Sequence, residues 1–180
     1  MTSNNKIVLT GIKETVRDLK KFDKDAARAF NKVVNAELSA AKKDAQSYVT
    51  AKPPLSGWAT QPARNPRSRG GVGWPAWDQS IIKTGITSTR AEGKVRKDYT
   101  TSAGALKNRS AAGVIYELAG RTNKGASTFI KNLEGQVGNA SRLVWKAVDK
   151  HRDKAQENIS KALEDAKKKL QQNLNMRRTS

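Results

Sequence analysis

The sequence predicts an α+β protein in which a small antiparallel sheet is flanked by a long N-terminal helix and a long C-terminal helix. Two segments, residues 24–50 and 139–175, repeat apolar side chains every three or four positions, which is the period of an amphipathic helix. Between them, residues 80–102 are rich in Ile and Thr, which favour strands. We expect residues 1–180 to form one domain, with an extended loop rich in Trp, Gly and Arg.

The N-terminal part, residues 11–50, is expected to be helical. Residues 6–10 before it could form a short strand or an extended lead-in, and residues 12–22 have helical spacing over two to three turns. Asp23 or Asp25 is a plausible N-cap for the longer helix that follows. The apolar stripe of that helix comprises Ala26, Phe30, Val33, Val34, Leu38, Ala41, Ala45, Tyr48 and Val49.

Residues 51–79 are predicted to form an extended arm or loop, because Lys52-Pro53-Pro54 ends the helix and Gly and Pro are frequent thereafter. Two interpretations stay open. The segment is an arm that becomes ordered on a partner subunit or on DNA, or it is a loop whose tryptophans fold back on the core of their own domain. The candidate contact residues of such an arm are Trp58, Arg64, Arg67, Arg69, Trp74 and Trp77.

Residues 80–110 are predicted to form a hairpin or a small sheet. The segment 80–90 is rich in Ile and Thr and is expected to be a strand, with Gly85 marking a bend or bulge. A turn at 91–93 and a second strand at 95–102 would complete an antiparallel hairpin, and residues 103–110 could continue the sheet.

The last part of the chain is expected to contain a short helix and a loop over residues 111–138 and a long helix over residues 139–175, followed by a frayed tail at 176–180. Asn139 or Ser141 is the expected N-cap of the long helix, which would extend for roughly 50 Å. So small a chain cannot bury the whole stripe of this helix, so we expect it to pack on the N-terminal helix and on a neighbouring subunit. The stripe comprises Val144, Val148, Ala155, Ile159, Ala162, Leu163, Ala166, Leu170 and Leu174.

The composition indicates a basic protein with a modest core. Hydrophobic residues make up 36% of the chain and charged residues 28%, and the formal net charge is +19, with +8 of it in residues 51–110. Such a charge favours polyanionic partners: nucleic acid, an acidic membrane face or acidic proteins. The absence of cysteine excludes disulfides and thiol chemistry. Neither a signal peptide nor a membrane span is expected, so the sequence predicts a soluble protein without a membrane partner.

The sequence does not predict an enzyme, a cofactor or a metal site. The single histidine, His151, lies among cations in the terminal helix and is expected to be a solvated surface residue. The acidic residues are scattered singly or occur in pairs that suit helix caps, and no phosphate-binding loop, dinucleotide fingerprint or nucleophile elbow is present.

Three short motifs in this chain resemble one known family. They are the entry Ile7-Val8-Leu9-Thr10-Gly11-Ile12-Lys13-Glu14, the segment Tyr116-Glu117-Leu118-Ala119-Gly120, and the block Arg142-Leu143-Val144-Trp145-Lys146-Ala147. The chain is similar in these motifs to the tail-component family of long-tailed double-stranded DNA bacteriophages, whose members are also described as neck, tail-completion or head–tail connector proteins. It departs from the family pattern in the position of the glycine after the aromatic-acid pair, in the absence of prolines from the second block, and in its longer insert at residues 55–78.

The resemblance implies a structural virion protein that forms a six- or twelve-fold homo-oligomeric ring at the head–tail junction. Its partners would be the adjacent connector, tail-terminator or tail-tube proteins, with non-specific contact to the DNA in the lumen. Its location would be the virion, and the host cytoplasm during assembly. The alternative from the charge alone is a basic, non-specific DNA-binding protein of nucleoid type, which would use Arg64, Arg67, Arg69 and the Lys-rich terminal helix. The missing catalytic chemistry argues against a third interpretation, a toxin or nuclease.

Five residues are expected to form a structural motif: Tyr116, Glu117, Gly120, Arg142 and Trp145. Glu117 would be an acid at a helix end, satisfied either by backbone amides or by an arginine, which could be Arg142 or one from the next subunit. Tyr116 and Trp145 would brace the sheet against the two long helices.

Overall fold

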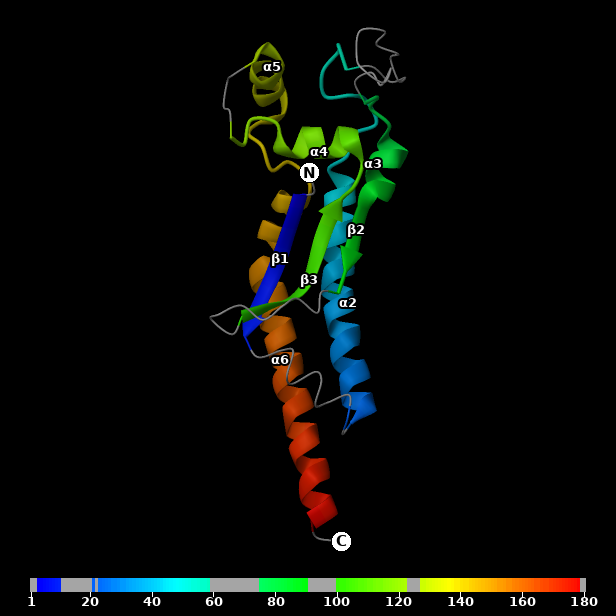
Figure 1. Ribbon diagram of the computed structural model, residues 1–180, viewed down its shortest axis with the longest axis vertical. Coiled ribbons are helices and arrows are strands. Elements are labelled where there is room, and N and C mark those ends of the chain that lie inside the picture. Colours follow the sequence, from blue (N-terminus) through cyan, green and yellow to red (C-terminus); the bar gives the residue numbers. More distant parts are fainter. Residues whose placement is uncertain are drawn as a thin grey trace, which may run out of the picture. The chain divides into compact units, whose positions relative to one another are not determined.

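The computed structural model describes residues 3–10, 21, 23–58, 75–90, 100–122 and 127–178. Within these segments the elements are β1 (Ser3–Thr10), α2 (Lys24–Ser47), α3 (Gln79–Gly85), β2 (Ile86–Thr89), β3 (Thr100–Asn108), α4 (Ala111–Leu118), α5 (Thr128–Val137) and α6 (Val144–Arg178). The three strands form an antiparallel sheet in the order β1-β3-β2 (Figure 1). The predicted α+β class, with a long helix toward each end of the chain, is therefore confirmed. Of the helix predicted over residues 12–22 the structure describes residue 21 alone, and the turn predicted at 91–93 lies outside the described residues.

The chain divides into two compact units, and the boundaries between them fall inside α2, β3 and α6. Unit 1 contains the described residues of segments 1–5, 42–87 and 106–147. Unit 2 contains the described residues of segments 6–41, 88–105 and 148–180.

In unit 2, the helical segments of α2 and α6 pack against each other in antiparallel directions. The side chain of Asn158 donates a hydrogen bond to Glu37 at 2.7 Å, and that of Asn173 donates one to Asp23 at 2.7 Å. The residue that comes later on α6 therefore meets the residue that comes earlier on α2, as in an antiparallel pair. At the second contact, small residues allow close approach: Ala26, Ala27 and Ala166 are buried together, with Leu170 packed on them. Asp23 also accepts hydrogen bonds from the N–H groups of residues 25 and 26, which confirms it as the N-cap of α2.

The sheet side of unit 2 approaches α2 closely at one glycine. A Cβ atom added to Gly104 of β3 would lie 2.5 Å from Cδ1 of Leu38, whose side chain is only 3% exposed. Glycine is required here by packing, because any side chain would displace a buried leucine.

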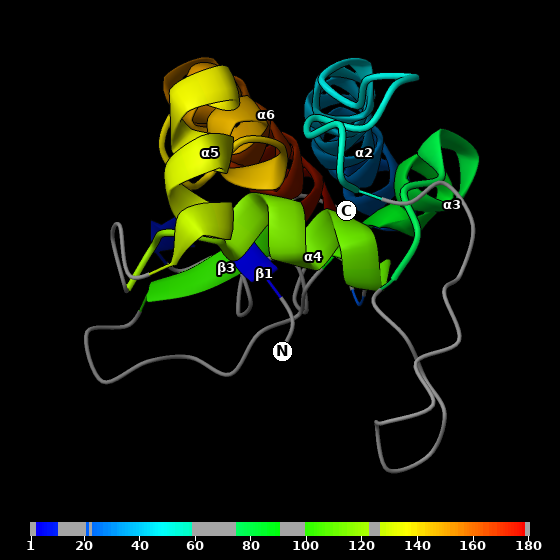
Figure 2. The same cartoon turned by 90° about the horizontal axis from the view of Figure 1, so that it is seen from above.

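In unit 1, α4 lies between α3 and α5 (Figure 2). α3 corrects the sequence prediction, which assigned residues 80–90 to a strand; only Ile86–Thr89 are extended. The carboxylate of Asp78 accepts hydrogen bonds from the N–H groups of Ser80 and Ile81 at 2.8 and 3.0 Å. This local N-cap starts a helix in a segment whose Ile-rich composition favours a strand, and Ile82 becomes its buried anchor.

Helices α4 and α5 also carry local caps at their starts. Ser110 accepts a hydrogen bond from the N–H of Gly113 at the start of α4, and Ser127 accepts one from the N–H of Ile130 at the start of α5. α5 occupies part of the segment 111–138 for which the sequence predicted one short helix and a loop. It ends at Gly138, which has a positive φ of 79°.

Candidate functional site

The buried acid Glu117 lies in the last turn of α4 and caps the start of α6. Its side chain is fully buried, at 0% exposure. Its Oε2 accepts hydrogen bonds from the N–H groups of Leu143 and Val144 at 2.5 and 3.2 Å, and its Oε1 accepts one from the N–H of Trp145 at 2.8 Å. The first N–H groups of a helix have no partner within the helix, and they carry partial positive charge. Glu117 supplies the acceptors that this helix end needs and, when it is ionised, also a favourable negative charge.

The buried cation Arg142 does the converse for two helix C-termini. Its guanidinium donates to the carbonyl oxygens of Tyr116 and Ala119, at the end of α4, at 2.6 and 3.1 Å. It also donates twice to the carbonyl oxygen of Gly138, directly after α5, at 3.0 and 2.7 Å. Cations are favourable at helix C-termini, where carbonyl groups lack partners. We call Glu117, Arg142 and the backbone groups that they bind the helix-end cluster.

Backbone groups, rather than each other, are the hydrogen-bond partners of both ions in the helix-end cluster. The sequence predicted either backbone amides or an arginine as the partner of Glu117, and the structure shows backbone amides. Arg142 acts on the pKa of Glu117 only as a nearby charge. The main chain adds one further link, since the N–H of Ser141 donates to the carbonyl oxygen of Glu117 at 2.7 Å. The cluster therefore ties the end of α4, the end of α5 and the start of α6 within unit 1.

Burial dominates the protonation equilibria of this cluster. It raises the pKa of Glu117 above its ordinary value, while the three amide hydrogen bonds and then Arg142 act in the opposite direction. Burial also lowers the pKa of Arg142, and the nearby Tyr116, Glu134 and Glu117 oppose that shift. An arginine nevertheless remains protonated in proteins. The pKa of the Tyr116 hydroxyl is raised, again mainly because of burial.

The N-cap predicted for α6 is wrong. The sequence indicated Asn139 or Ser141, but the helix begins at Val144, and Ser141 has a φ of 78°, whereas an N-cap residue is usually extended. The capping role passes to Glu117, a residue 26 or more positions away in the chain. Sequence patterns reveal caps only when they are local, so this one could not be read from its neighbours.

The other residues of the predicted motif lie around the helix-end cluster. The Tyr116 ring lies under the Arg142 guanidinium, 5.6 Å from ring centroid to guanidinium carbon, and the Trp145 ring lies under that of Arg121 at 4.2 Å. Gly120 has a φ of +90°, and a Cβ atom there would lie 2.3 Å from a carboxylate oxygen of Glu134. The positive φ therefore favours glycine at position 120, and a Cβ atom there would also have to displace the tip of the Glu134 side chain.

Two tryptophans of the predicted partner arm are instead part of the core of unit 1. Trp58 and Trp77 are 3% and 2% exposed, and their rings meet edge to face at 5.2 Å. Trp77 continues the contact to Tyr116 at 5.2 Å, and Trp58 to Phe129 at 5.5 Å. Each indole N–H has a backbone acceptor, at Pro75 for Trp58 and at Thr50 for Trp77.

For these two residues the fold-back interpretation of the arm is correct, because each ring finds aromatic neighbours and an acceptor within its own unit. The other four candidates, Arg64, Arg67, Arg69 and Trp74, lie outside the described residues.

The described residues contain no group of three or more His, Asp or Glu side chains that could hold a metal ion. In the same residues, no helix combines the length and the apolar composition needed to cross a membrane. His151, expected to be a solvated surface residue, is partly exposed on α6.

The sequence did not reveal two further features of unit 1. Asn108 is fully buried; its side-chain oxygen accepts from the N–H and hydroxyl of Ser110 and so positions the cap of α4. An open groove also lies beside α5, and its single sequence signal is Gly135, a glycine inside a helical segment.

No family model matches the chain, and no curated protein and no solved structure is significantly similar to it.

Proposed function

We propose that this chain is a structural virion protein of a tailed bacteriophage, without enzymatic activity of its own. Its subunits would form a ring at the head–tail junction and join the capsid connector to the tail tube around the path of the DNA. The basis for the proposal is the resemblance of three motifs to the tail-component family.

The observation that carries this proposal is the physical link between two of those motifs. Residues 116–120 contribute Glu117 and two carbonyl groups to the helix-end cluster, and residues 142–147 contribute Arg142 and the amides at the start of α6. Two motifs that bind each other in one buried cluster are expected if both serve to maintain the fold that members of the family share. The acid of the cluster is fully buried and bonded to three amides, which suits a structural role better than proton transfer.

The proposal is tested first by the mass of the purified protein in solution. Size-exclusion chromatography with light scattering, confirmed by native mass spectrometry after nuclease treatment, should give one discrete hexamer or dodecamer without DNA. A Glu117→Ala variant should lose the ring, whereas Glu157→Ala, which removes an exposed carboxylate from α6, should retain it. A monomer or dimer that becomes larger only on adding DNA contradicts the ring.

Location in the particle gives an independent test. A reconstruction of the virion that contains this protein should show density for it between the capsid connector and the tail tube. Density elsewhere in the particle, or absence of the protein from purified particles, contradicts the proposed role.

A second function, non-specific DNA binding, is favoured by one feature of α6. Lys154, Lys161 and Lys168 are exposed and seven residues apart, so they lie on one side of the helix about two turns from each other. Such a row can follow a phosphate backbone, and binding through it would weaken steeply with salt.

Duplex binding distinguishes the two functions. If DNA binding is the main role, changing the three lysines to Gln should reduce affinity for a 30-base-pair duplex and flatten its salt dependence by about three ion equivalents. The matched control removes the same charge from exposed positions of α2, at Lys24, Lys32 and Lys43. Equal effects of the two triple variants would show that net charge alone, and no particular surface, attracts DNA.

A further inference from the structure

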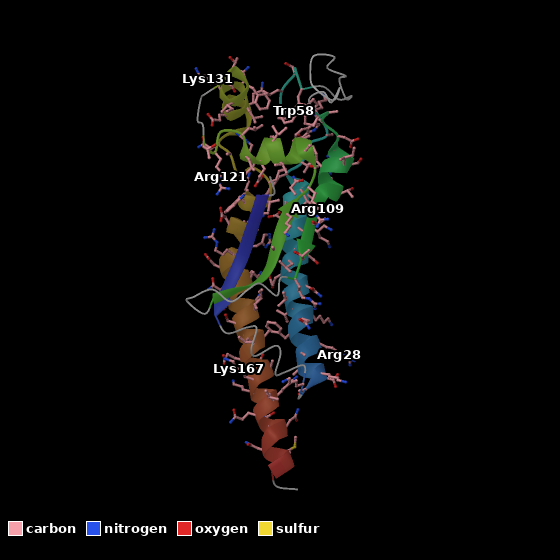
Figure 3. The ribbon with its side chains drawn as sticks, in the orientation of Figure 1. Arg28, Trp58, Arg109, Arg121, Lys131 and Lys167 are labelled. Atoms are coloured by element: carbon pink, nitrogen blue, oxygen red, sulfur yellow. The ribbon has the colours of Figure 1, made fainter. Side chains whose placement is uncertain are left out.

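An open groove in unit 1 lies between the turn at residues 55–58 and helix α5. Its volume is about 660 Å³. Leu55, Trp58 and Phe129 form the apolar part of its lining, and the Trp58 and Phe129 rings are locked edge to face at 5.5 Å. Figure 3 labels Trp58 and Lys131, which contribute to the groove from its two sides. The aromatic part of the lining is therefore rigid, as is usual for a preformed binding site.

Two glycines line this groove at positions where neither packing among the described residues nor backbone conformation requires glycine. A Cβ atom added to Gly57 or to Gly135 would meet nothing within 4 Å, and neither residue has a positive φ. Gly135 lies inside α5, where glycine is about 1 kcal/mol less favourable than alanine. Gly104 and Gly120, by contrast, would place a Cβ against neighbouring atoms. Packing among the described residues therefore does not require glycine at Gly57 or Gly135, and the space beside them can admit another molecule.

The polar side chains along the groove suit an extended peptide. Asn132 and Gln136 are exposed, make no hydrogen bond to another described residue, and each offer a donor and an acceptor. They are four residues apart on α5, which places them about 6 Å apart along the helix axis. An extended chain presents equivalent peptide groups every two residues, or about 6.6 Å. The two carboxamides can thus bind successive exposed peptide groups of one strand.

Charge identifies the class of peptide. Among the described residues that line the groove, the single charged one is Lys131, which is exposed and one residue from Asn132. A second copy of this chain, with its net charge of +19, would meet electrostatic repulsion here. An acidic segment would be attracted both by Lys131 and by the field of the whole chain.

We propose that this groove binds an extended, acidic segment of a partner protein. Apolar side chains of the segment contact Leu55 and Phe129, its backbone bonds to Asn132 and Gln136, and a carboxylate pairs with Lys131. The proposal goes beyond the ring proposed above and does not depend on it, because the groove lies entirely within unit 1.

The test begins with a random library of linear dodecapeptides, displayed and selected on the full-length protein. Enriched sequences should carry net negative charge and apolar residues at alternate positions. Each is then synthesised with a fluorescein label, and its Kd is measured by fluorescence anisotropy. Gly135→Tyr fills the groove and Lys131→Glu reverses its charge, so each should raise the Kd at least tenfold.

Matched variants separate loss of the groove from loss of the fold. Gly135→Ala adds one methyl group to open space and should leave the Kd within twofold, as should Lys161→Glu, which makes the same charge change on α6. Should Gly135→Tyr fail to fold by circular dichroism, the double change Asn132→Ala and Gln136→Ala takes its place and should weaken binding by the same factor.

Three outcomes overturn the proposal. They are a selection that yields no acidic peptides, enriched peptides that bind the filled and open variants equally well, and a change of oligomeric mass in Gly135→Tyr. The last would show that the occupant is a second copy of this chain. Ring formation by the wild-type protein is measured separately, so failure of the groove and failure of the ring are distinguishable.

Discussion

Replacing Glu117 by alanine should loosen or unfold the start of α6. The change leaves the N–H groups of Leu143, Val144 and Trp145 without their acceptor, and the first two of these residues are fully buried. A buried donor left unpaired costs about 1–3 kcal/mol. Removing the carboxylate also relieves its own desolvation, so we expect a net loss of about 3 kcal/mol rather than the sum for three amides.

Two measurements check this value and its location. Urea unfolding followed by circular dichroism at 222 nm gives the free energy of unfolding for wild type and variant. Hydrogen–deuterium exchange with mass spectrometry, on a peptide that covers residues 140–147, reports protection of the three amides directly. In Glu117→Ala that peptide should exchange faster than in wild type, even under conditions where β3 and α5 stay protected.

The control is Glu157→Ala, which removes an exposed carboxylate from the same helix α6. Its free energy of unfolding should stay within about 0.5 kcal/mol of wild type. The reasoning is refuted if Glu117→Ala unfolds within 1 kcal/mol of wild type, or if residues 143–145 keep their protection. Either result would mean that water or another group replaces the carboxylate at no appreciable cost.

Three further predictions concern the same architecture. Burial raises the pKa of Glu117 above its ordinary 4.5, so the folded chain binds a proton at this carboxyl more tightly than the unfolded chain does. The resulting contribution of Glu117 to the free energy of unfolding is fully present below pH 4.5 and declines as the pH rises through the pKa of the folded state. The unfolding free energy of wild type minus that of Glu117→Gln, measured in urea from pH 4 to pH 8, should therefore fall; a rising difference would show that the amides and Arg142 outweigh burial. Arg142→Lys replaces a planar guanidinium that binds three carbonyl groups by a single ammonium, and should lower the free energy of unfolding by about 2 kcal/mol. The control is Arg152→Lys on the exposed face of α6. Gly104→Ala should cost about 1–3 kcal/mol in thermal or urea unfolding because its Cβ would lie 2.5 Å from Leu38, and most of that loss should return in the double variant with Leu38→Val; no recovery would contradict the contact.

The regular elements were predictable where one local signal dominates. The stripe of α2 has helical period over many turns, and Asp23 provides its cap in the sequence itself. Residues 80–85 were mispredicted because two local signals compete there: Ile and Thr favour a strand, whereas Asp78 accepts two amide hydrogen bonds and starts a helix.

The candidate site was predictable only in part. The sequence singled out Glu117 and Arg142 as members of one motif and indicated a helix end for the acid. It did not indicate that Arg142 binds the carbonyl groups at the end of α4, since this needs the three-dimensional meeting of residues 26 and 23 positions apart in the chain. The groove beside α5 was missed for the same reason, because its two sides come from residues 55–58 and 129–136.

The sequence by itself determined the class of the fold, the two long helices, the strongly basic charge and the position of an acid, Glu117, at a helix end. These follow from periodicity, composition and residue chemistry, which act over a few neighbouring positions. Only the tertiary structure decided which helix ends the buried acid and base serve, that Trp58 and Trp77 are core residues, and that Gly57 and Gly135 face open space. The physical reason is that burial and hydrogen-bond partners depend on segments far apart in the chain, and a buried carboxylate or indole takes the partner that packing brings to it.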